Sequence, residues 1–590
     1  MKKTITLLIF GLLTTLGFSQ EIISGTITDT NNVPLGGVSV SILDTPKGTV
    51  TDFDGNYEIE ANSTDILVFS YIGFIVQNVP VENQTTINIV LQENTEQLSE
   101  VVVTALGIKK EKKALGYAVQ EVDGESLEKA KEPNFVNSLS GKVAGLTVKN
   151  STDLFQNPEI NLRGASPLIV IDGIPDRTTD IWKVNADDIE NISVLKGATA
   201  SALYGSVGRN GAIMITTKKG KKGRFTVTAN NSTMFQPSFI KVPEVQTTYG
   251  NGNQGSYAYV NGSGSGTEGG GWIWGPKLDQ LDPTTPSGYF ETPQYNSLVN
   301  PETGELVPLP FISRGKDNIE NFFRTGLIQS NNISVDWGSD KASYRMSIAN
   351  VYQKGIVPNT DLKNTSFTVG GSLNPSEKFS INSSLTYNKQ YTNNFPEVGY
   401  GPTNYLYNLI LWTGTDVDVN NLRNYWREGE EGYQQRHFNV SYYNNPYFQA
   451  YEYLRGYNKD NIFGNANFEY KITSNLSFKG RSGVNVYSLY RTYKEPKSYI
   501  GYGDKSRGNF SLQDTNYFDI TSDLGFKYTN DLTEDISINA EVAYSNYYRN
   551  YSFHQSATDG LNIPGFYNLD NNSGSTLFGE NVVEKETIHS

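Results

Sequence analysis

Apolar and polar residues alternate over long runs in the C-terminal part of the chain, from Arg224 onward. In one run Ile536, Ile538, Ala540, Val542 and Tyr544 alternate with Ser537, Asn539, Glu541, Ala543 and Ser545. In another, Phe379, Ile381, Leu385 and Tyr387 alternate with Ser380, Asn382, Ser384 and Thr386. A period of two predicts β-strands with one apolar face. The polar face is mostly uncharged, and strand ends carry the aromatic residues Tyr487, Tyr490, Tyr544, Tyr547 and Tyr548.

That combination is typical of strands that cross a bilayer, with lipid against the apolar face and water in the lumen. The linkers alternate in length, because residues 374–377 and 473–475 are short whereas residues 391–435 are long. Short periplasmic turns and long external loops give this asymmetry. The pattern predicts an antiparallel transmembrane β-barrel that begins at residue 224 and continues to residue 590.

The N-terminal region, residues 20–93, is expected to form a small β-sandwich. Short β-like runs separated by turn residues occur at 23–28, 37–42, 49–51, 57–59, 67–71 and 86–91. Asp54-Gly55 between the third and fourth runs predicts a hairpin. Residues 52–55 also resemble a fragment of a calcium loop, but the remaining ligand positions and the distal Glu are missing, which favours a plain turn.

The region between the sandwich and the barrel has two parts. Residues 94–113 form a polar and basic linker around a short β-branched run at 98–104, which is either a detachable strand or the first strand of the next domain. Residues 114–223 predict an α+β domain, with short helices at 124–130 and 135–139 and strands at 168–171, 188–196 and 211–217.

The first residues read as an export signal. Lys2 and Lys3 precede an apolar segment at 5–16, and residues 17–19 offer small side chains at a cleavage site. The apolar segment is shorter than the roughly 20 residues that a spanning helix needs, so a cleaved signal peptide over residues 1–19 is favoured over an anchor. Later segments are not apolar enough to span as helices, and closed β-barrels are the alternative way to span a membrane.

The amino-acid composition limits the partners and reactions that are open to this chain. The 590 residues include 48 Lys+Arg and 62 Asp+Glu, a net charge of −14, which disfavours nucleic acid as a partner. The chain has no Cys and three His (His437, His554 and His589). Thiol chemistry and disulfides are therefore excluded, and most His-dependent catalysis is disfavoured. We expect no enzyme activity, no cofactor and no metal site.

Several motifs resemble those of the SusC-like (SusC/RagA type) TonB-dependent outer-membrane transporters, and the resemblance covers the whole chain. Residues 24–91 look like the carboxypeptidase-regulatory-like sandwich of that family. Leu98, Ser99, Glu100, Val101, Val102, Val103 and Thr104 resemble the TonB box. Residues 139–146, 162–164, 167–175, 200–206 and 210–213 are similar to its plug signatures, and residues 271–276 and 322–326 to its early barrel motifs.

The resemblance implies import of a nutrient, a glycan or an oligopeptide, across the outer membrane of a Gram-negative cell. TonB, energised by ExbB and ExbD, would pull on residues 98–104, which can pair with a partner sheet through main-chain hydrogen bonds. A SusD-like surface lipoprotein would cap the barrel as a lid. Metal-chelate uptake is a less favoured substrate class.

The plug motif residues are open to two interpretations. They are Arg163, Gly164, Asp172, Gly173, Tyr204, Gly205, Asn210 and Gly211. As functional residues they would couple release of the plug to the barrel wall. As structural residues they would form turns and packing contacts with a buried ion pair, which is the favoured interpretation. Similarly, Trp272, Trp274, Trp412 and Trp426 in the loops either stack on sugar rings or, as favoured, serve packing and interfaces.

One feature departs from the family, whose barrels close with about 22 strands. Residues 224–590 hold ten or eleven strand-like runs and end at 583–590 without a terminal aromatic strand. An open edge in lipid leaves backbone groups unpaired at several kcal/mol each. The expectation is an incomplete barrel, the N-terminal part of a longer protein. Two rival functions are a signal transducer that uses the sandwich and, less favoured, an exported β-rich hydrolase.

Overall fold

The computed structural model describes residues 21–590, except 44, 46, 72–73, 93–100, 104–108, 112–118, 129–133, 150–156, 221–222, 224, 238–243, 258–271, 398, 440–441, 502–505, 534–535 and 575–576. The predicted signal peptide lies outside the described residues. The chain divides into two compact units, one of residues 1–102 with 109–116 and one of residues 103–108 with 117–590. Each is described by itself below.

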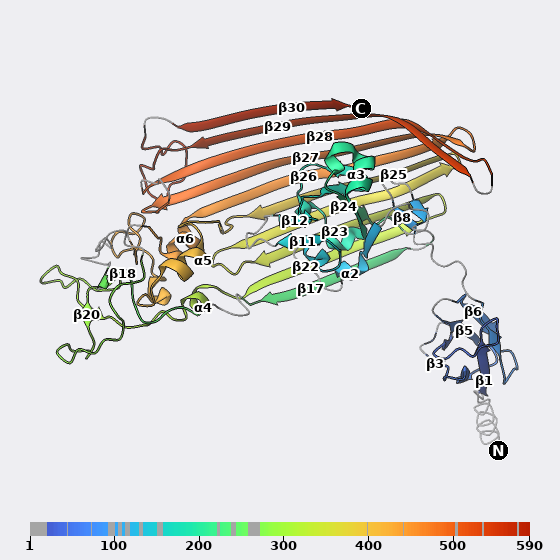
Figure 1. Cartoon of the computed structure of the whole chain (residues 1–590), viewed down its shortest axis with the longest axis horizontal. Helices are drawn as coiled ribbons and strands as arrows, with labels where there is room; N and C mark the ends of the chain where they lie inside the picture. Colours follow the sequence, from blue (N-terminus) through green and yellow to red (C-terminus); the bar gives the residue numbers. More distant parts are fainter. Residues whose placement is uncertain are drawn as a thin grey trace, which may run out of the picture. The chain divides into compact units, whose positions relative to one another are not determined.

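The first unit is a β-sandwich of two small sheets (Figure 1). One sheet has the order β4-β1-β7, with β1 Glu21–Thr28, β4 Asn56–Ala61 and β7 Ile89–Val90. The other has the order β3-β2-β5-β6, with β2 Ser39–Ile42, β3 Gly48–Val50, β5 Ile66–Ser70 and β6 Gln77–Pro80. Alternating strand residues fill a core that includes Ile23, Val40, Leu67 and Phe69, all fully buried. The predicted sandwich is therefore confirmed.

The predicted hairpin around Asp54-Gly55 is wrong, although the turn itself forms. Strands β3 and β4 belong to different sheets, so the chain crosses from one layer to the other here. The Asp52 carboxylate accepts hydrogen bonds from the backbone N–H groups of Asp54 and Asn56, at 3.0 and 2.8 Å, and Gly55 has φ of 76°. A turn of this kind does not require that its flanking strands pair, because their apolar faces decide which sheet each strand joins.

The second unit begins with an α+β domain, the plug. Its main sheet has the order β10-β15-β16-β13-β14. These strands are β10 Val119–Asp123, β13 Leu168–Ile171, β14 Ile174–Asp176, β15 Ile189–Leu195 and β16 Ala212–Thr217, and a separate pair joins β11 Leu146–Lys149 to β12 Glu159–Leu162. The helices are short, with α2 Glu125–Glu128, η3 Asn137–Leu139, η4 Ile181–Lys183, η5 Ala186–Asp188, α3 Gly197–Tyr204 and η6 Gly205–Gly208.

The rest of the second unit is an antiparallel sheet of ten long strands in sequence order (Figure 1). They are β17 Thr226–Gln236, β22 Gly326–Gly338, β23 Ala342–Lys354, β24 Asp361–Ser376, β25 Phe379–Thr392, β26 Leu454–Lys471, β27 Leu476–Lys497, β28 Arg507–Asp531, β29 Ser537–Ala557 and β30 Phe578–His589. Among the residues that the structure describes, no pairing joins β17 to β30. The sheet is thus a partial barrel, as expected from the strand count.

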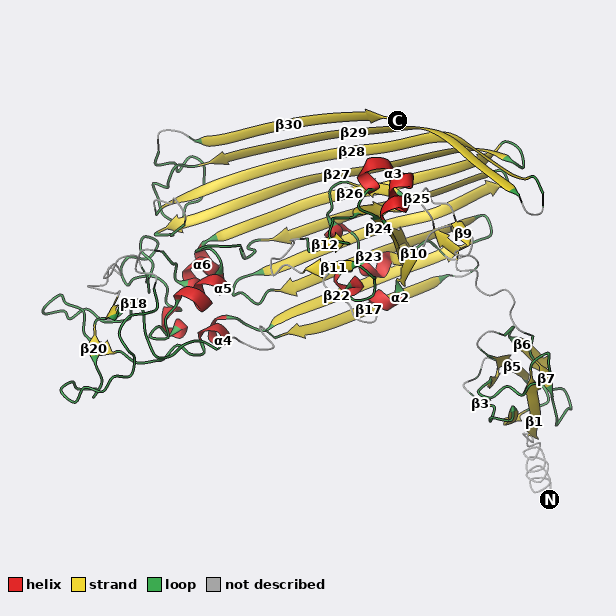
Figure 2. Cartoon of the chain, in the orientation of Figure 1, coloured by secondary structure: helices red, strands yellow, loops and turns green. Residues whose placement is uncertain are grey.

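Connections at the two ends of these strands differ in length. At one end the strands are joined by residues 339–341, 377–378, 472–475 and 532–536. At the other end lie the long connections 237–325 and 393–453. These long connections carry the short elements β18 Gly252–Asn253, β19 Ser256–Tyr257, β20 Glu291–Thr292, β21 Leu309–Pro310, α4 Asn318–Phe322, α5 Tyr405–Tyr407, η7 Asn408–Trp412, η8 Val419–Leu422 and α6 Pro446–Glu452 (Figure 2). The predicted alternation of short turns and long loops holds for these two loops, whereas β23 and β24 are joined at the same end by residues 355–360 alone.

The barrel strands have the reverse of a soluble protein's burial pattern. On β23, Tyr344, Met346 and Ile348 are 42%, 53% and 52% exposed, whereas the intervening Arg345 and Ser347 are buried. Leu385 and Tyr387 on β25 are likewise exposed beside buried Thr386. Polar residues therefore face the plug and apolar residues face outward, which is the arrangement expected for strands in lipid.

Helices do not provide a membrane span here: within the described ranges, none is long and apolar enough to cross a bilayer.

Candidate functional site: the plug against the barrel wall

The tip of one plug hairpin lies against the barrel wall. Strands β13 and β14 are joined by Asp172 and Gly173, with φ of 48° and 86°, and two positive φ values identify a type I′ turn. The Asp172 carboxylate accepts hydrogen bonds from the backbone N–H and hydroxyl of Thr217 in the plug, at 2.9 and 2.7 Å. It also accepts hydrogen bonds from Ser384 of β25 and Asn465 of β26, at 3.2 and 3.3 Å. Asp172 therefore joins the plug to the wall.

The second residue of this turn contacts a neighbouring strand. The Gly173 carbonyl accepts a hydrogen bond of 2.7 Å from the Arg481 guanidinium of β27, which also pairs with Asp523 of β28. One residue further, Ile174 packs so closely on Gly483 of β27 that a Cβ at that glycine would lie 2.5 Å from the Ile174 side chain. Three adjacent strands of the wall thus hold the hairpin tip.

The expected buried ion pair between Arg163 and Asp172 is wrong. Arg163 is exposed, in a turn where its φ is 54° and that of Gly164 is 86°. Its backbone N–H donates to the Gly145 carbonyl at 2.7 Å. Because the Asp172 carboxylate is already satisfied by hydroxyl, amide and backbone donors, it needs no guanidinium.

The remaining plug motif residues have contacts within the plug. Helix α3 ends at Tyr204, and Gly205 follows with φ of 64°. The Asn210 amide donates to the Ser166 carbonyl at 3.3 Å. At Gly211, with φ of 94°, a Cβ would lie 2.5 Å from the Leu162 side chain. These positions shape turns and close packing, and this packing agrees with the structural interpretation of them.

Sequence reasoning missed a buried ion pair that joins the plug to the wall. Asp180 accepts from the backbone N–H of Trp182 at the start of η4, and its other carboxylate oxygen lies 2.5 Å from the Lys459 ammonium of β26. Gln390 of β25 donates to the same oxygen at 3.1 Å. Burial alone would raise the pKa of the Asp180 carboxyl, but the Lys459 ammonium and these hydrogen bonds outweigh it and keep that pKa below its ordinary value.

A second missed contact lies farther around the wall. Asp188 of η5 accepts from the Ser347 hydroxyl at 2.6 Å and from the Arg345 guanidinium at 3.1 Å, both on β23. Arg345 also pairs with Asp336 of β22 at 2.9 Å. All four side chains are buried. The neighbouring Asp187 accepts a hydrogen bond of 2.9 Å from the Asn230 amide of β17. Plug residues 172–188 therefore contribute four carboxylates, each of which has partners on the wall.

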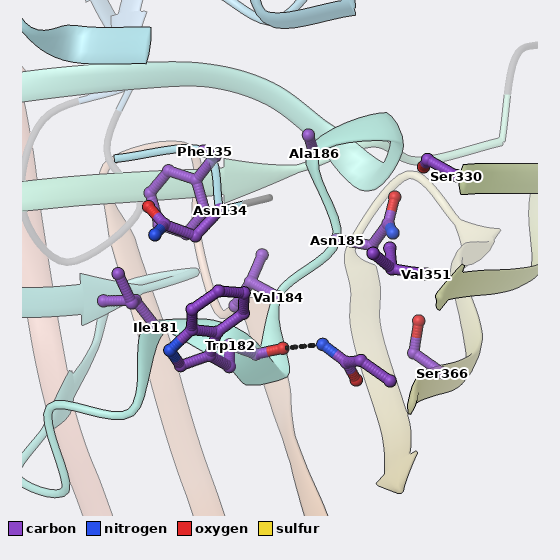
Figure 3. Close-up of a pocket in the computed structure, with 11 residues that line it drawn as sticks. Asn134, Phe135, Ile181, Trp182, Val184, Asn185, Ala186, Ser330, Val351 and Ser366 are labelled. Carbon is purple, nitrogen blue, oxygen red and sulfur yellow. Dashed lines mark hydrogen bonds between the residues drawn. The ribbon is translucent and has the colours of Figure 1, made fainter. Parts of the chain in front are cut away.

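A small cavity lies between these contacts (Figure 3). Its volume is about 20 Å³, and Trp182 and Asn185 of the plug line it together with Ser330, Val351 and Ser366 of the wall. Asn364 of β24, which also lines it, donates to the Trp182 carbonyl at 2.8 Å. A space of this size with polar lining suits a single water molecule.

The predicted TonB box, residues 98–104, is described in part. Val101–Val103 form strand β8, which pairs with β9, Lys109–Glu111, in a two-stranded sheet. Leu98, Ser99, Glu100 and Thr104 lie outside the described residues. A two-stranded sheet has two outer edges, so β8 can pair with a further strand.

The two long loops pack together through a shared aromatic core. It contains Tyr295, Phe322, Tyr405, Phe438 and Tyr447 among its buried members. Trp412 stacks on Tyr443 with ring centres 5.5 Å apart, and Trp426 packs edge-on against Phe448 at 5.1 Å. Trp272 and Trp274 are 47% and 56% exposed. Two of the four predicted tryptophans therefore serve loop packing, and two present apolar surface.

A buried carboxyl joins the two loops. Asp416 is fully buried, and its Oδ1 accepts from the Asn251 backbone N–H at 2.8 Å. Among the residues that the structure describes, its Oδ2 has no hydrogen-bond partner. Burial raises the pKa of Asp416 to about 6, although the hydrogen bonds from Asn251 and the nearby Arg314 oppose the shift. The neutral form is therefore favoured over much of the acid range.

Comparisons with known proteins agree with this architecture. The CarboxypepD_reg-like domain model matches residues 23–103, and the TonB-dependent Receptor Plug Domain model matches residues 111–212. TonB-dependent receptor SusC of Bacteroides thetaiotaomicron is 31% identical over 66% of this chain and 36% of its own length. TonB-dependent receptor P39 of Formosa agariphila is 36% identical over 38% of this chain and 22% of its own length.

A solved structure shares the fold. The RagAB peptide importer in its open-open state has a TM-score of 0.61 at 18% identity, over 82% of this chain and 53% of that chain. The chain spans about a third, or less, of the length of the curated relatives that it matches. The resemblance drawn from the sequence motifs is confirmed.

Replacing Lys459 with Met is expected to loosen the plug locally. The substitution leaves Asp180 buried without its ammonium partner, and breaking a buried pair costs about 3–5 kcal/mol. Amide hydrogen exchange at residues 180–184 should accelerate by roughly a hundredfold or more. The double variant Asp180→Asn/Lys459→Met should recover most of the protection.

The matched control is Lys389→Met. Lys389 pairs with Asp460 at 2.6 Å, nearly the same distance, but the two side chains are 33% and 45% exposed. Solvent screens such a pair, so plug exchange should stay at the wild-type rate. Equally accelerated amide exchange in Lys459→Met and Lys389→Met would contradict the role of the buried Asp180–Lys459 pair in holding the plug.

The loop core is expected to loosen as pH rises. Because the folded pKa of Asp416, about 6, exceeds the ordinary value of 3.8, its stabilising contribution is complete below about pH 4 and is lost as pH rises through 6. From pH 5 to pH 8, protection factors at residues 413–419 should fall by roughly tenfold in the wild type relative to Asp416→Asn. The control is Asp317→Asn at an exposed position of the same loop assembly, which should behave like the wild type. If the ratio of wild-type to Asp416→Asn protection factors did not change between pH 5 and pH 8, the raised pKa of Asp416 would be refuted.

Proposed function

Because this chain is a relative of the SusC-like TonB-dependent receptors, we propose that it takes part in TonB-dependent import of a nutrient across the outer membrane. The observation that supports the proposal most directly is the plug on the polar face of the strand sheet. Its carboxylates Asp172, Asp180 and Asp188 are held there by hydrogen bonds and ion pairs, beside an apolar cluster that joins the plug to Leu362 and Tyr457 of the wall. Contacts of this kind break and re-form without unfolding the wall.

Energy for such a cycle must arrive mechanically, since the outer membrane holds no nucleotide pool or ion gradient. We propose that TonB, energised by ExbB and ExbD, adds a strand to residues 98–104. The main-chain ladder would supply much of the affinity. Strand β8 supports this role, because it is short and belongs to a sheet of only two strands.

The topology of the plug suggests where the force acts first. Strand β10 follows the linker and lies at one edge of the plug sheet, where its single partner is β15 over residues 119–123. The hairpin β13–β14, which carries the wall contacts of Asp172 and Gly173, forms the opposite edge. A pull on residues 98–104 would therefore separate β10 from β15 before it reaches the anchored hairpin.

The relatives support a proposal for the partner and the substrate class. RagAB is a peptide importer, and SusC is a TonB-dependent receptor. We propose a SusD-like lipoprotein lid over the long loops and a glycan or an oligopeptide as cargo. The exposed Trp272 and Trp274 offer a surface for stacking on either. The matched relatives are receptors and transporters rather than enzymes, and we assign no catalytic step.

A proline in the TonB box provides the test. In the complete protein, Val102→Pro removes a ladder donor, and proline is excluded from paired strand interiors. We expect energy-dependent uptake to fall to the level of a strain without TonB, while the amount of protein in the outer membrane stays unchanged. Val102→Ala keeps the backbone donor and should transport at a rate close to wild type.

Three measurements are needed: uptake, outer-membrane fractionation and cross-linking to TonB. Uptake by the proline variant at the wild-type rate would contradict the coupling proposal. Recovery of the protein in the soluble fraction would contradict the outer-membrane location and favour an exported enzyme.

A further inference from the structure

Two arginines lie on the polar face of the wall near its long-loop end. They are Arg455 on β26 and Arg491 on β27, and they share the inward face with the buried Tyr457. Both guanidiniums pack on the ring of Phe395, with their carbons 4.3 and 5.7 Å from its centre. Both also contact Tyr493, since Arg455 lies 5.8 Å from that ring and Arg491 donates to its hydroxyl at 3.2 Å. Two positive groups are thus gathered around the same two rings.

Their charges are incompletely neutralised. Arg455 lies 3.5 Å from the Glu397 carboxylate, whose side chain is 37% exposed. Arg491 has no carboxylate within ion-pair distance in the part of the chain that the structure describes. The ten barrel strands hold six arginines, and the other four, Arg345, Arg481, Arg507 and Arg549, each have a carboxylate within 4.0 Å. Arg491 is therefore the exception among them.

Several of their N–H groups are also unsatisfied. Among the described residues, Nε of Arg491 and Nε of Arg455 are buried without a hydrogen-bond acceptor, and Nη1 of Arg455 has the Glu397 carboxylate at 3.5 Å but no well-aligned hydrogen bond. In the described part of the chain no hydrogen bond engages the Nη2 atom of either arginine, and both residues are partly exposed. A buried donor without an acceptor costs about 1–3 kcal/mol, and more when it is charged. If the two arginines had a purely structural role, the free-energy cost of their unsatisfied N–H groups would remain uncompensated.

We propose that Arg455 and Arg491 form a subsite for an anionic group of the imported molecule, a carboxylate or a sulfate ester. A planar guanidinium donates two parallel hydrogen bonds to such a group, and the aromatic rings hold both side chains in place. This inference rests on the proposed import function and narrows its substrate class to acidic molecules. Tyr457 packs with the plug core that contains Trp182, so a bound anion would lie next to the plug.

The minimal probe is inorganic sulfate. The complete protein, purified in a neutral detergent, is titrated with radiolabelled sulfate at constant ionic strength set by chloride. We expect one saturable site, with affinity roughly tenfold weaker in Arg491→Gln because a charge-assisted donor is lost. Arg427→Gln, a half-exposed arginine of the long loop, is the matched control and should bind as the wild type does.

A second variant changes the affinity in the opposite direction. Glu397→Gln removes the carboxylate that competes for Arg455, so sulfate should bind several-fold more tightly. This variant retains both arginines and therefore tests the subsite even if Arg491→Gln does not fold. Equal sulfate binding in the wild type, Arg491→Gln and Glu397→Gln would overturn the proposal, as would an absence of saturable binding to the wild type.

Competition identifies the source of the anion. The displacement of bound radiolabelled sulfate is measured with triglutamate and with trigalacturonate. Triglutamine and maltotriose serve as their neutral counterparts. Displacement by triglutamate points to an acidic peptide and displacement by trigalacturonate to an acidic glycan, whereas displacement by neither would contradict the subsite. Binding is measured without TonB, so Val102→Pro should leave it unchanged, and a failure of the coupling proposal stays distinguishable from a failure of this one.

Discussion

A buried carboxylate must have partners, and this requirement determines how the plug is held. Asp172, Asp180 and Asp188 would each be costly to place in a protein interior without donors. The wall supplies those donors from β23, β25 and β26, including the Lys459 ammonium and the Arg345 guanidinium. Each of these contacts supplies donors to one plug carboxylate and fixes the position of that carboxylate against the wall. The polar face of the sheet is thus the complement of the plug, while its apolar face is left for lipid.

The same contacts bear on the proposed release of the plug. Uncharged residues such as Ser330, Ser366 and Asn364 occupy much of the wall between the ion pairs, and a small polar cavity lies there. Leu362 and Tyr457 of the wall belong to the same apolar cluster as the plug core, so the free energy of the proposed release includes apolar as well as polar contacts. The edge position of β10 allows part of the plug sheet to open while the β13–β14 hairpin stays in place.

The sequence predicts the fold better than the site. Alternation over residues 379–387 predicts the orientation of the strand correctly, because a period of two is a local property, whereas residues 536–544 are exposed on both faces. The Asp54-Gly55 turn forms as expected, yet its flanking strands join different sheets, since pairing depends on distant partners. Asp180 and Lys459 are 279 positions apart, and no local pattern relates them. Asp172 can be recognised in the sequence because Asp172-Gly173 is a turn dipeptide. Its partners Ser384 and Asn465 lie in no motif that would identify them.

The central claim is that the plug hairpin lies against the wall at rest and must leave it for import. Cysteines at Ile174 and Gly483 test it directly, since the two residues touch and the 590-residue chain has no cysteine of its own. In the complete protein in native membranes, mild oxidation should cross-link the two cysteines and stop uptake. Reduction of the disulfide should restore uptake. Failure to cross-link, or uptake at an unchanged rate by the cross-linked protein, would contradict the account.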